Sequence, residues 1–361
     1  MQTSPLISIV IPSYNQAKYI AYNLDSILAQ TYTNFEVIFI DDGSKDNTAE
    51  ILKSYSEKDS RIKYFYQNNS ERAVARSHGI SKAAGKYVCL VDSDDTWLPH
   101  KLETQLAVME NDPEIILCYA PVNRIDPENK PLKNATRQQK GYSGLIYKHL
   151  LMRNFIPSVT PMIRASVLKN IGEQVTDFIP YEDWDFWLRL SRCGKFHHIK
   201  EALGNYRLHP QQSVKNVKAT RIEEVTIKVL DANTQEFLLE LDGTVAKRAS
   251  SRLRRTNDRS VLLVHEDHED DENAEIGDWQ LSLDEKDFKA SVQQAYSLAY
   301  LRIAYWHLVA GDSKTAQEKL KVSLSKNTLR LIDPRFIILR LCCYLSSFNK
   351  ELVTKFLGGF H

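Results

Sequence analysis

Three aspartates stand within four positions of the chain, directly after a short apolar stretch. They are Asp92, Asp94 and Asp95, in the sequence VCLVDSDDTW. Asp92 and Asp94 are two residues apart, so on an extended chain both side chains leave on the same face. Carboxylate oxygens are the ligands that Mg²⁺ and Mn²⁺ prefer, and substrate phosphates usually complete the coordination. The spacing predicts a hard-cation site. The alternative is that Asp94 or Asp95 caps a helix over 97–110, and capping by Asp95 is compatible with metal binding by the other two.

Acidic side chains also end a second apolar stretch and open a later helix. Asp41 and Asp42 end the apolar part of FEVIFIDDGS. The stretch YEDWDFWLRLSRCG is predicted to be a helix with Glu182, Asp183 and Asp185 in its first turn. Carboxylates suit that position because the amino-terminal end of a helix carries partial positive charge.

The first half of the chain alternates apolar strands with amphipathic helices. The predicted strands span 6–12, 35–42, 61–67 and 86–92, and the predicted helices span 17–30, 47–55 and 71–84. This alternation indicates an α/β fold with a mainly parallel sheet covered on both faces. Ligands of such sheets bind outside the carboxyl ends of the strands. We therefore expect one crevice to be lined by the ends of the first, second and fourth strands, namely 12–14, 41–42 and 92–94.

Three local details follow from the same patterns. Gly85 is expected to be the C′ residue that closes the helix over 71–84. The stretch EIILCYAPV, residues 114–122, is predicted to be one further strand. The stretch PSVTPMIRASVLKNIG predicts a short strand followed by a helix.

Composition restricts the class of protein. The chain has 361 residues, 43% of them hydrophobic, and a net charge of +1, so charge does not indicate a nucleic-acid binder. The five cysteines are an odd number without a CxxC pair, which favours reduced thiols in a cytoplasmic protein. No stretch reaches the roughly 18 apolar residues that span a bilayer, and no signal peptide is visible.

The last third of the chain differs in composition. Residues 215–280 are predicted to be a charged linker, in which His265 and His268 belong to a solvated acidic loop rather than to a metal site. The region 281–361 is predicted to be helical, with a hairpin of tetratricopeptide type over 288–326 whose aromatic face needs a partner. The segment 336–348 is compatible with an interfacial helix at the inner membrane face, although packing within the protein is the alternative that we favour.

Four stretches in a fixed order carry a resemblance to a known family. They are SIVIPSYNQAKYIAYNLDSILAQTYTNFEVIFIDDGSKDNT, AVARSHGISKAAGKYVCLV, the following DSDD, and YEDWDFWLRL. Together they resemble the family 2 glycosyltransferases over about residues 8–213. The resemblance implies the GT-A nucleotide-diphospho-sugar transferase fold and a catalytic domain over 1–214.

The resemblance also implies roles for the donor-binding residues. Pro12 and Tyr14 would border the uracil of a UDP-sugar, with Tyr14 stacked on the base. Asp42 would accept a hydrogen bond from the base, and Asp41 would lie close to the base or ribose. The remaining nucleotide-sugar contacts would come from Arg76, Asp92 and Ser93.

For catalysis, the resemblance implies a DxD motif, Asp92 and Asp94, that meets the ribose and a Mn²⁺ or Mg²⁺ bridging the diphosphate. Asp183 would be the base that takes the proton of the acceptor hydroxyl, and the anomeric carbon would be inverted. His209 is a candidate to touch the metal or the diphosphate, and Arg207 a candidate to balance phosphate charge. A structural role is the alternative for each.

The expected activity is therefore metal-dependent, inverting transfer of one sugar to a glycan, lipid-linked or protein acceptor in surface glycan or glycolipid assembly. The QxxRW motif of processive synthases does not follow the stretch that contains Asp183, which favours single-sugar transfer. NSERAVAR replaces the usual glycine-rich turn before Arg76. A receiver domain fits poorly because nothing in it explains YEDWD. A catalytically silent nucleotide-sugar-binding module is the second alternative.

Overall fold

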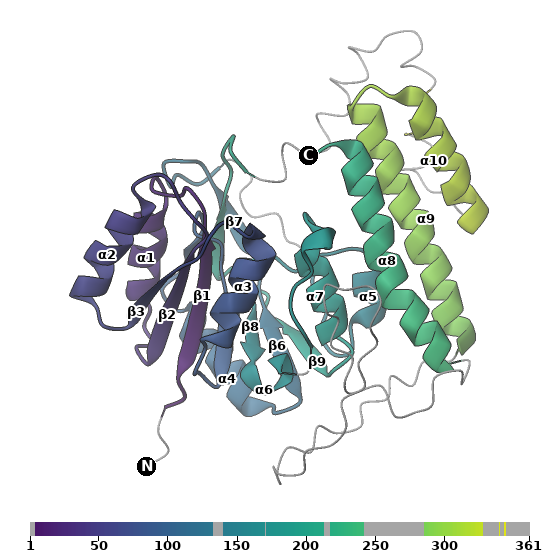
Figure 1. Ribbon diagram of the computed structural model, residues 1–361. Coiled ribbons are helices and arrows are strands. Elements are labelled where there is room, and N and C mark those ends of the chain that lie inside the picture. The colour runs from purple at the N-terminus through teal and green to yellow at the C-terminus, as the bar shows by residue number, and fades with distance from the viewer. Residues whose placement is uncertain are drawn as a thin grey trace. The chain divides into compact units, whose positions relative to one another are not determined.

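The computed structural model describes residues 4–132, 140–169, 171–212, 217–241, 285–327, 339 and 343 (Figure 1). Two compact units are present. The described residues of the N-terminal unit are those up to Tyr147 and those of 155–212. The described residues of the helical unit are those of 148–154, 217–241 and 285–327, with 339 and 343.

Strands and helices alternate through the N-terminal unit. In chain order they are β1 (Ile7–Ser13), α1 (Ile20–Leu28), β2 (Phe35–Asp41), α2 (Thr48–Lys58), β3 (Ile62–Tyr66), α3 (Glu71–Ser81), β4 (Tyr87–Leu90), β5 (Thr96–Trp97), α4 (Lys101–Asn111), β6 (Ile115–Tyr119), β7 (Val122–Ile125), α5 (Tyr147–Met152, most of which lies in the helical unit), β8 (Met162–Arg164), α6 (Ala165–Leu168), the 3₁₀ turn η1 (Thr176–Phe178), α7 (Glu182–Leu190), β9 (Lys195–His198) and β10 (Gly204–Arg207).

A seven-stranded sheet forms the centre of this unit, in the order β3-β2-β1-β4-β8-β6-β9. Adjacent strands of this sheet are parallel, except that β8 runs antiparallel to both β4 and β6. Every residue of β1 and β2 is buried, as strands covered on both faces require. The predicted α/β class with a mainly parallel sheet is confirmed.

The carboxyl ends of β1, β2 and β4 meet at one edge of this sheet, because β1 is paired in parallel with both of its neighbours. Ser13 at the end of β1 is in register with Asp41 at the end of β2. The acidic loop, residues 92–95, follows β4 after one residue, Val91. The expected grouping of these ends is confirmed.

One predicted strand is divided. Residues 114–122 form not one strand but β6, which belongs to the large sheet, and the first residue of β7, which belongs to a three-stranded sheet in the order β5-β10-β7. Pro121 stands at the break. Proline lacks the N–H that a continuous strand needs, so the chain changes sheet there.

Gly85 does not close α3, contrary to the sequence prediction. The helix ends at Ser81 with Lys82 as its C-cap. Gly85 instead lies against β1, where a Cβ atom would stand 2.7 Å from both the Leu6 carbonyl oxygen and the Ser8 backbone nitrogen. Glycine is required at position 85 because two backbones approach closely there, and not because a helix ends there.

Gly79 allows α3 to lie directly on the sheet. The helix packs against β1 and β2 (Figure 1). A Cβ atom at residue 79 would stand 2.3 Å from Cγ1 of Val10 and 3.3 Å from Cγ1 of Ile40. Both neighbours are fully buried, so neither has free space to move into.

Replacing Gly79 by alanine is therefore expected to lower the free energy of unfolding by about 1–3 kcal/mol, the usual cost of overpacking a core. Urea denaturation measures the change. Ser81→Ala, an exposed position at the end of the same helix, is the control and should stay within about 0.5 kcal/mol of the parent. An equally stable Gly79→Ala protein would show that α3 can move away from β1 without cost.

The helical unit contains α8 (Ala219–Leu241), α9 (Glu285–Val309) and α10 (Ser313–Lys326). Two of these helices, α9 and α10, form a hairpin: Gly311, at φ +82°, makes the turn, and the Asp312 carboxylate caps α10 by accepting a hydrogen bond from the Thr315 N–H at 3.0 Å. Leu301, Leu308 and Leu320 are buried between the two helices. In the described part of the chain, no helix is long and apolar enough to cross a membrane.

The prediction of a charged linker over 215–280 is wrong for residues 219–241, which form α8. Ile222, Val225 and Val229 recur at helical spacing and are buried. The helix packs against α9, and Glu223 accepts a hydrogen bond from His307 at 3.1 Å. The α9–α10 hairpin needs a partner for its aromatic face, and α8, which the sequence analysis assigned to a linker, supplies part of it.

Three other predictions lie outside the described residues. They concern the acidic loop with His265 and His268, the remainder of the linker, and the interfacial helix over 336–348, of which Leu339 and Cys343 alone are described and are buried.

Candidate functional site

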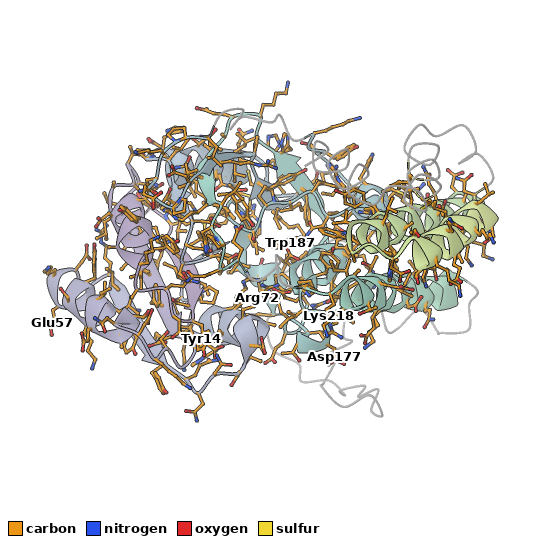
Figure 2. All side chains as sticks on the ribbon, turned by 90° about the horizontal axis from the view of Figure 1, so that it is seen from above. Tyr14, Glu57, Arg72, Asp177, Trp187 and Lys218 are labelled. Carbon is orange, nitrogen blue, oxygen red and sulfur yellow. The ribbon has the colours of Figure 1, made fainter. Side chains whose placement is uncertain are left out.

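The ends of β1 and β2 contribute Pro12, Tyr14, Asp41 and Asp42. Asp41 is fully buried and satisfied locally: its two carboxylate oxygens accept from the Ser44 N–H at 2.9 Å and the Tyr64 hydroxyl at 3.0 Å. Pro12 is buried within β1, whereas Tyr14, which follows it and is labelled in Figure 2, is 44% exposed. An exposed aromatic ring at this edge is suited to stacking on a planar ligand.

Asp42 is held by the loop that follows β3. Its Oδ1 atom accepts hydrogen bonds from Gln67 Nε2 at 2.7 Å and from the Ser70 N–H at 2.9 Å. Ser70 belongs to the NSERAVAR stretch that departs from the family pattern. Although NSERAVAR replaces the glycine-rich turn of the family pattern, this loop still contacts Asp42 through Ser70.

The acidic loop is supported from α1 and from β10. Asn23 Nδ2 donates to the carbonyl oxygens of Asp92 at 3.2 Å and Asp95 at 2.9 Å. The Asp95 carboxylate accepts from the Arg207 N–H at 2.9 Å and is 1% exposed. Burial and the charges of Asp94 and Asp92 raise the pKa of Asp95 well above its usual range.

The alternative that Asp94 or Asp95 caps the following helix is wrong. That helix is α4, which begins at Lys101 with His100 at the N-cap position. β5 and a turn come first. Asp95 instead joins the acidic loop to β10.

Asp94 and His209 lie together at the acidic loop. His209 Nε2 is 2.9 Å from Asp94 Oδ2, and the imidazole is 1% exposed. The ring packs on Tyr19, with 4.8 Å between centroids. Carboxylate and imidazole are a donor pair that Mn²⁺ accepts, so the residues present fit a divalent cation. Within the described residues, no group of three or more histidine, cysteine, aspartate and glutamate side chains is arranged to hold a metal ion.

Asp92 is engaged differently from Asp94. Its Oδ1 accepts from Arg76 Nη2 at 2.5 Å, and its Oδ2 accepts from the Ser158 hydroxyl at 3.3 Å. Burial alone would raise the pKa of Asp92, but the Arg76 guanidinium outweighs it and holds the pKa below its usual value. Ser93 is buried between the two aspartates, 3% exposed.

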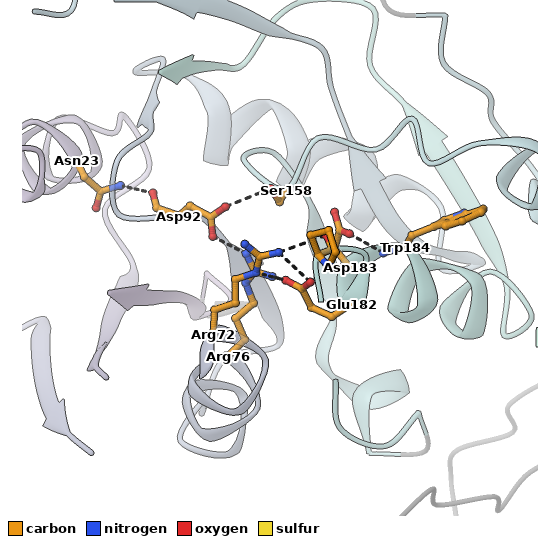
Figure 3. A network of polar contacts seen from close by, with 9 residues as sticks. Asn23, Arg72, Arg76, Asp92, Ser158, Glu182, Asp183 and Trp184 are labelled. Carbon is orange, nitrogen blue, oxygen red and sulfur yellow. Dashed lines mark hydrogen bonds and ion pairs between the residues drawn. The ribbon is translucent and has the colours of Figure 1, made fainter. Parts of the chain in front are cut away.

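Two arginines from consecutive turns of α3 join the acidic loop to α7 (Figure 3). Arg76 donates to Asp92 and also to Glu182 Oε1, at 2.9 Å. Arg72 donates through Nε to the same Oε1 atom and through Nη2 to Oε2, at 3.0 Å. In Figure 3 the two guanidinium groups stand between Asp92 on one side and the first turn of α7 on the other.

Asp183 differs from the two other carboxylates of that turn. Glu182 is 1% exposed and bound by two arginines, and Asp185 is fully buried and paired with Arg189 at 2.8 Å. Asp183 is partly exposed. Burial in the protein and the charge of Glu182 raise the pKa of Asp183 to about 6, although Arg76 and Arg72 act against the shift.

Arg207 has the contacts of the structural alternative considered from the sequence. Its side chain is 0% exposed. The guanidinium donates to the Asp94 carbonyl at 2.7 Å and to the Asp126 and Pro127 carbonyls, each at 3.1 Å. Nη2 donates to the side-chain oxygen of Asn129, so Arg207 joins the acidic loop to the turn over 126–129.

Sequence reasoning missed the residues that position the site: Asn23, Arg72, Ser158 and, as a partner of arginine, Glu182. One of them carried a usable signal. Arg72 and Arg76 are four residues apart on a predicted helix and therefore share a face. Asn23 and Ser158 belong to ordinary helix and loop stretches and carried none.

The sequence of this chain is similar to those of known glycosyltransferases. Residues 8–172 match the family model described as Glycosyl transferase family 2. An uncharacterised glycosyltransferase of Rickettsia typhi is 33% identical over 224 residues, which are 61% of this chain and 69% of the relative. TuaG of Bacillus subtilis, a proposed teichuronic acid biosynthesis glycosyltransferase, is 33% identical over 206 residues, 56% of this chain and 79% of the relative.

Solved structures show the same fold. S. aureus TarS is similar with a TM-score of 0.58 and 16% identity, covering 97% of this chain and 89% of that chain. The mannosyltransferase PcManGT from Pyrobaculum calidifontis, in complex with GDP-Man and Mn²⁺, is similar with a TM-score of 0.56 and 13% identity, covering 99% and 85%. The mixed α/β fold, the family model and relatives matched over more than two thirds of their length lead to one conclusion: this chain belongs to glycosyl transferase family 2 and is a glycosyltransferase.

Proposed function

We propose that the protein transfers one sugar, with inversion, from a nucleoside-diphosphate sugar, UDP-linked by preference, to an acceptor hydroxyl, and that the region 1–214 carries the reaction. The observation that carries this proposal is Asp183. Its carboxylate is partly exposed, has a pKa raised to about 6, and is joined to the DxD aspartate Asp92 through Glu182 and Arg76. A carboxylate with a raised pKa at a partly open position is suited to accept a proton.

The donor would occupy the edge formed by β1, β2 and the acidic loop. Tyr14 would stack on the base, Asp42 would accept its N–H, and Asp41 would hold the turn beside the ribose. Asp92 and Ser93 would meet the sugar-phosphate part, with Arg76 fixing the Asp92 carboxylate. PcManGT binds GDP-Man, so GDP-linked sugars are tested beside UDP-linked ones.

Asp94 and His209 would hold a Mn²⁺ or Mg²⁺ ion together with oxygens of the diphosphate. A bound divalent cation supplies Lewis-acid neutralisation of the departing nucleoside diphosphate. Asp92 contributes less directly, because Arg76 and Ser158 already engage both of its oxygens.

In the chemical step, Asp183 takes the proton of the acceptor hydroxyl as that oxygen forms a bond to C1 of the sugar. The bond from C1 to the diphosphate oxygen breaks on the opposite face, so the anomeric configuration inverts. One base suffices because the leaving diphosphate requires no proton. The acceptor would be a glycan, lipid-linked or protein hydroxyl, and the similarity to TuaG favours surface-polysaccharide assembly.

A panel of sugar nucleotides tests the proposal. The full chain is incubated with UDP- and GDP-linked sugars, with and without Mn²⁺, and release of nucleoside diphosphate is measured beside thermal stabilisation by UDP and GDP. We expect one donor to be hydrolysed slowly in a metal-dependent way and its nucleotide to stabilise the protein. Stabilisation without turnover of any donor, in the presence of an acceptor pool, would favour the silent binding module instead.

A further inference from the structure

We propose that Glu182 is a positioning residue for Asp183: bound by Arg72 and Arg76, it fixes the first turn of α7 and thereby the position of the adjacent carboxylate. This inference rests on the proposed role of Asp183 as the base. It assigns functions to Glu182 and Arg72, and Arg76 connects Glu182 to the donor-binding residue Asp92.

The contacts show how firmly Glu182 is held. Its two carboxylate oxygens receive three hydrogen bonds, two from Arg72 and one from Arg76, and its side chain is 1% exposed. Arg72 also donates to the Pro180 carbonyl at 3.2 Å, just before α7. The fork of a guanidinium fixes both direction and distance, so the backbone at 180–182 is placed relative to α3.

The position of this cluster is informative. Burying charged groups is costly, and a well-packed apolar cluster of similar volume is often at least as stable. Here three charged side chains are placed directly beside the candidate base. Arg76 donates hydrogen bonds to both Asp92 and Glu182, whereas Arg72 donates to Glu182 and to the Pro180 carbonyl.

Charges of both signs act on Asp183 from this cluster. Glu182, on its own helix, raises the pKa of Asp183, and Arg76 and Arg72, on α3, lower it. The turn η1, which packs against both helices, carries Asp177. Removing Glu182 and removing Arg72 should therefore shift the Asp183 titration in opposite directions, whereas loss of a purely structural clamp would not.

The experiment compares pH profiles of turnover for full-length variants with the donor found in the panel. Turnover falls on the acidic side of the pH profile, and this fall is called the acid limb. Glu182→Gln keeps the shape of the side chain but removes its negative charge, so the acid limb should move to lower pH. Arg72→Gln removes a positive charge, so the limb should move to higher pH. Each variant is expected to move the acid limb by about one pH unit, which is the effect of a charge at close range. Turnover on the plateau should fall in both because the turn is no longer held.

Two matched variants separate charge from structure. Arg72→Lys keeps the positive charge but loses the fork, so it should lower plateau turnover while leaving the acid limb near that of the parent. Arg61→Gln removes an arginine that pairs with Asp59 just before the amino-terminal end of β3, and it should change neither quantity. Thermal melting confirms that each variant is folded.

The outcomes distinguish this inference from the proposed function. If Glu182→Gln and Arg72→Gln lower turnover with unmoved acid limbs, while Asp183→Asn is inactive, the clamp is merely structural and the inference fails alone. If Glu182→Gln is inactive and Asp183→Asn is active, Glu182 is the base and both fail. Should Glu182→Gln not fold, the pair Arg72→Gln and Arg72→Lys still decides, because these variants differ in charge at one position.

Discussion

Replacing Asp183 by asparagine is expected to lower turnover by at least about two decades, since general-base assistance contributes typically ~10²–10⁴-fold. In free energy this is ~3–5 kcal/mol of barrier. The amide keeps the size of the side chain but accepts no proton at neutral pH. Affinity for the nucleotide should stay near that of the parent, because no donor contact is assigned to Asp183. Steady-state kinetics and calorimetric titration with the nucleotide measure the two quantities.

The pH dependence provides a second criterion for the same residue. A base must be deprotonated to act, and the pKa of Asp183 is raised to about 6. Turnover of the parent enzyme should therefore fall as the pH drops through about 6, and the residual activity of Asp183→Asn should lack that limb. Asp185→Asn is the matched change on the same helix, at a fully buried carboxylate paired with Arg189. If Asp183→Asn transfers sugar at a near-normal rate, the base has to be sought at Glu182 or Asp185.

Replacing Asp94 by alanine is expected to abolish transfer and to weaken the Mn²⁺-dependent part of nucleotide binding. Asp94 is the carboxylate next to His209 and would hold the cation with the diphosphate. We expect a loss of metal affinity at least as large as the roughly 10–100-fold seen when outer-shell partners of a metal are changed. Calorimetric titration of UDP with and without Mn²⁺ measures it.

The control for this variant is Asp25→Ala, which removes an exposed carboxylate from α1 whose partner is the Tyr55 hydroxyl. It should leave both turnover and the metal dependence unchanged. An Asp94→Ala protein that binds UDP with the Mn²⁺ dependence of the parent would show that Asp94 is not a metal ligand. Asp92, already bound to Arg76 and Ser158, would then be the next carboxylate to test.

Elements built from local pattern were predicted correctly. β1 and β2 are continuous apolar runs, and α7 begins at the acidic turn that the sequence predicts. The errors occurred where a distant contact overrides the local signal. Gly85 resembles a helix terminator but is required by the backbone of β1. Residues 219–241 were assigned to a linker together with the basic and acidic stretches that follow them, but a buried stripe with Ile222 and Val225 packs this segment as α8.

By itself the sequence determined which chemical groups are present and at which sheet edge they gather, because parallel strands place their carboxyl ends together and the order of the motifs follows the chain. Only the tertiary structure decided which partner each of those groups has. Asp92, Asp94 and Asp95 are almost adjacent in the chain, yet one pairs with Arg76, one with His209 and one with the backbone of Arg207. Likewise Glu182 and Asp183 are neighbours, but arginines from α3 bind the first and leave the second partly exposed with a raised pKa. The physical reason is that the state of a carboxylate depends on burial and on charges within a few ångströms. Those charges come from other segments of the chain, 16 residues away for Arg76 and Asp92, 106 for Arg76 and Glu182 and 115 for His209 and Asp94, and no local pattern encodes such contacts.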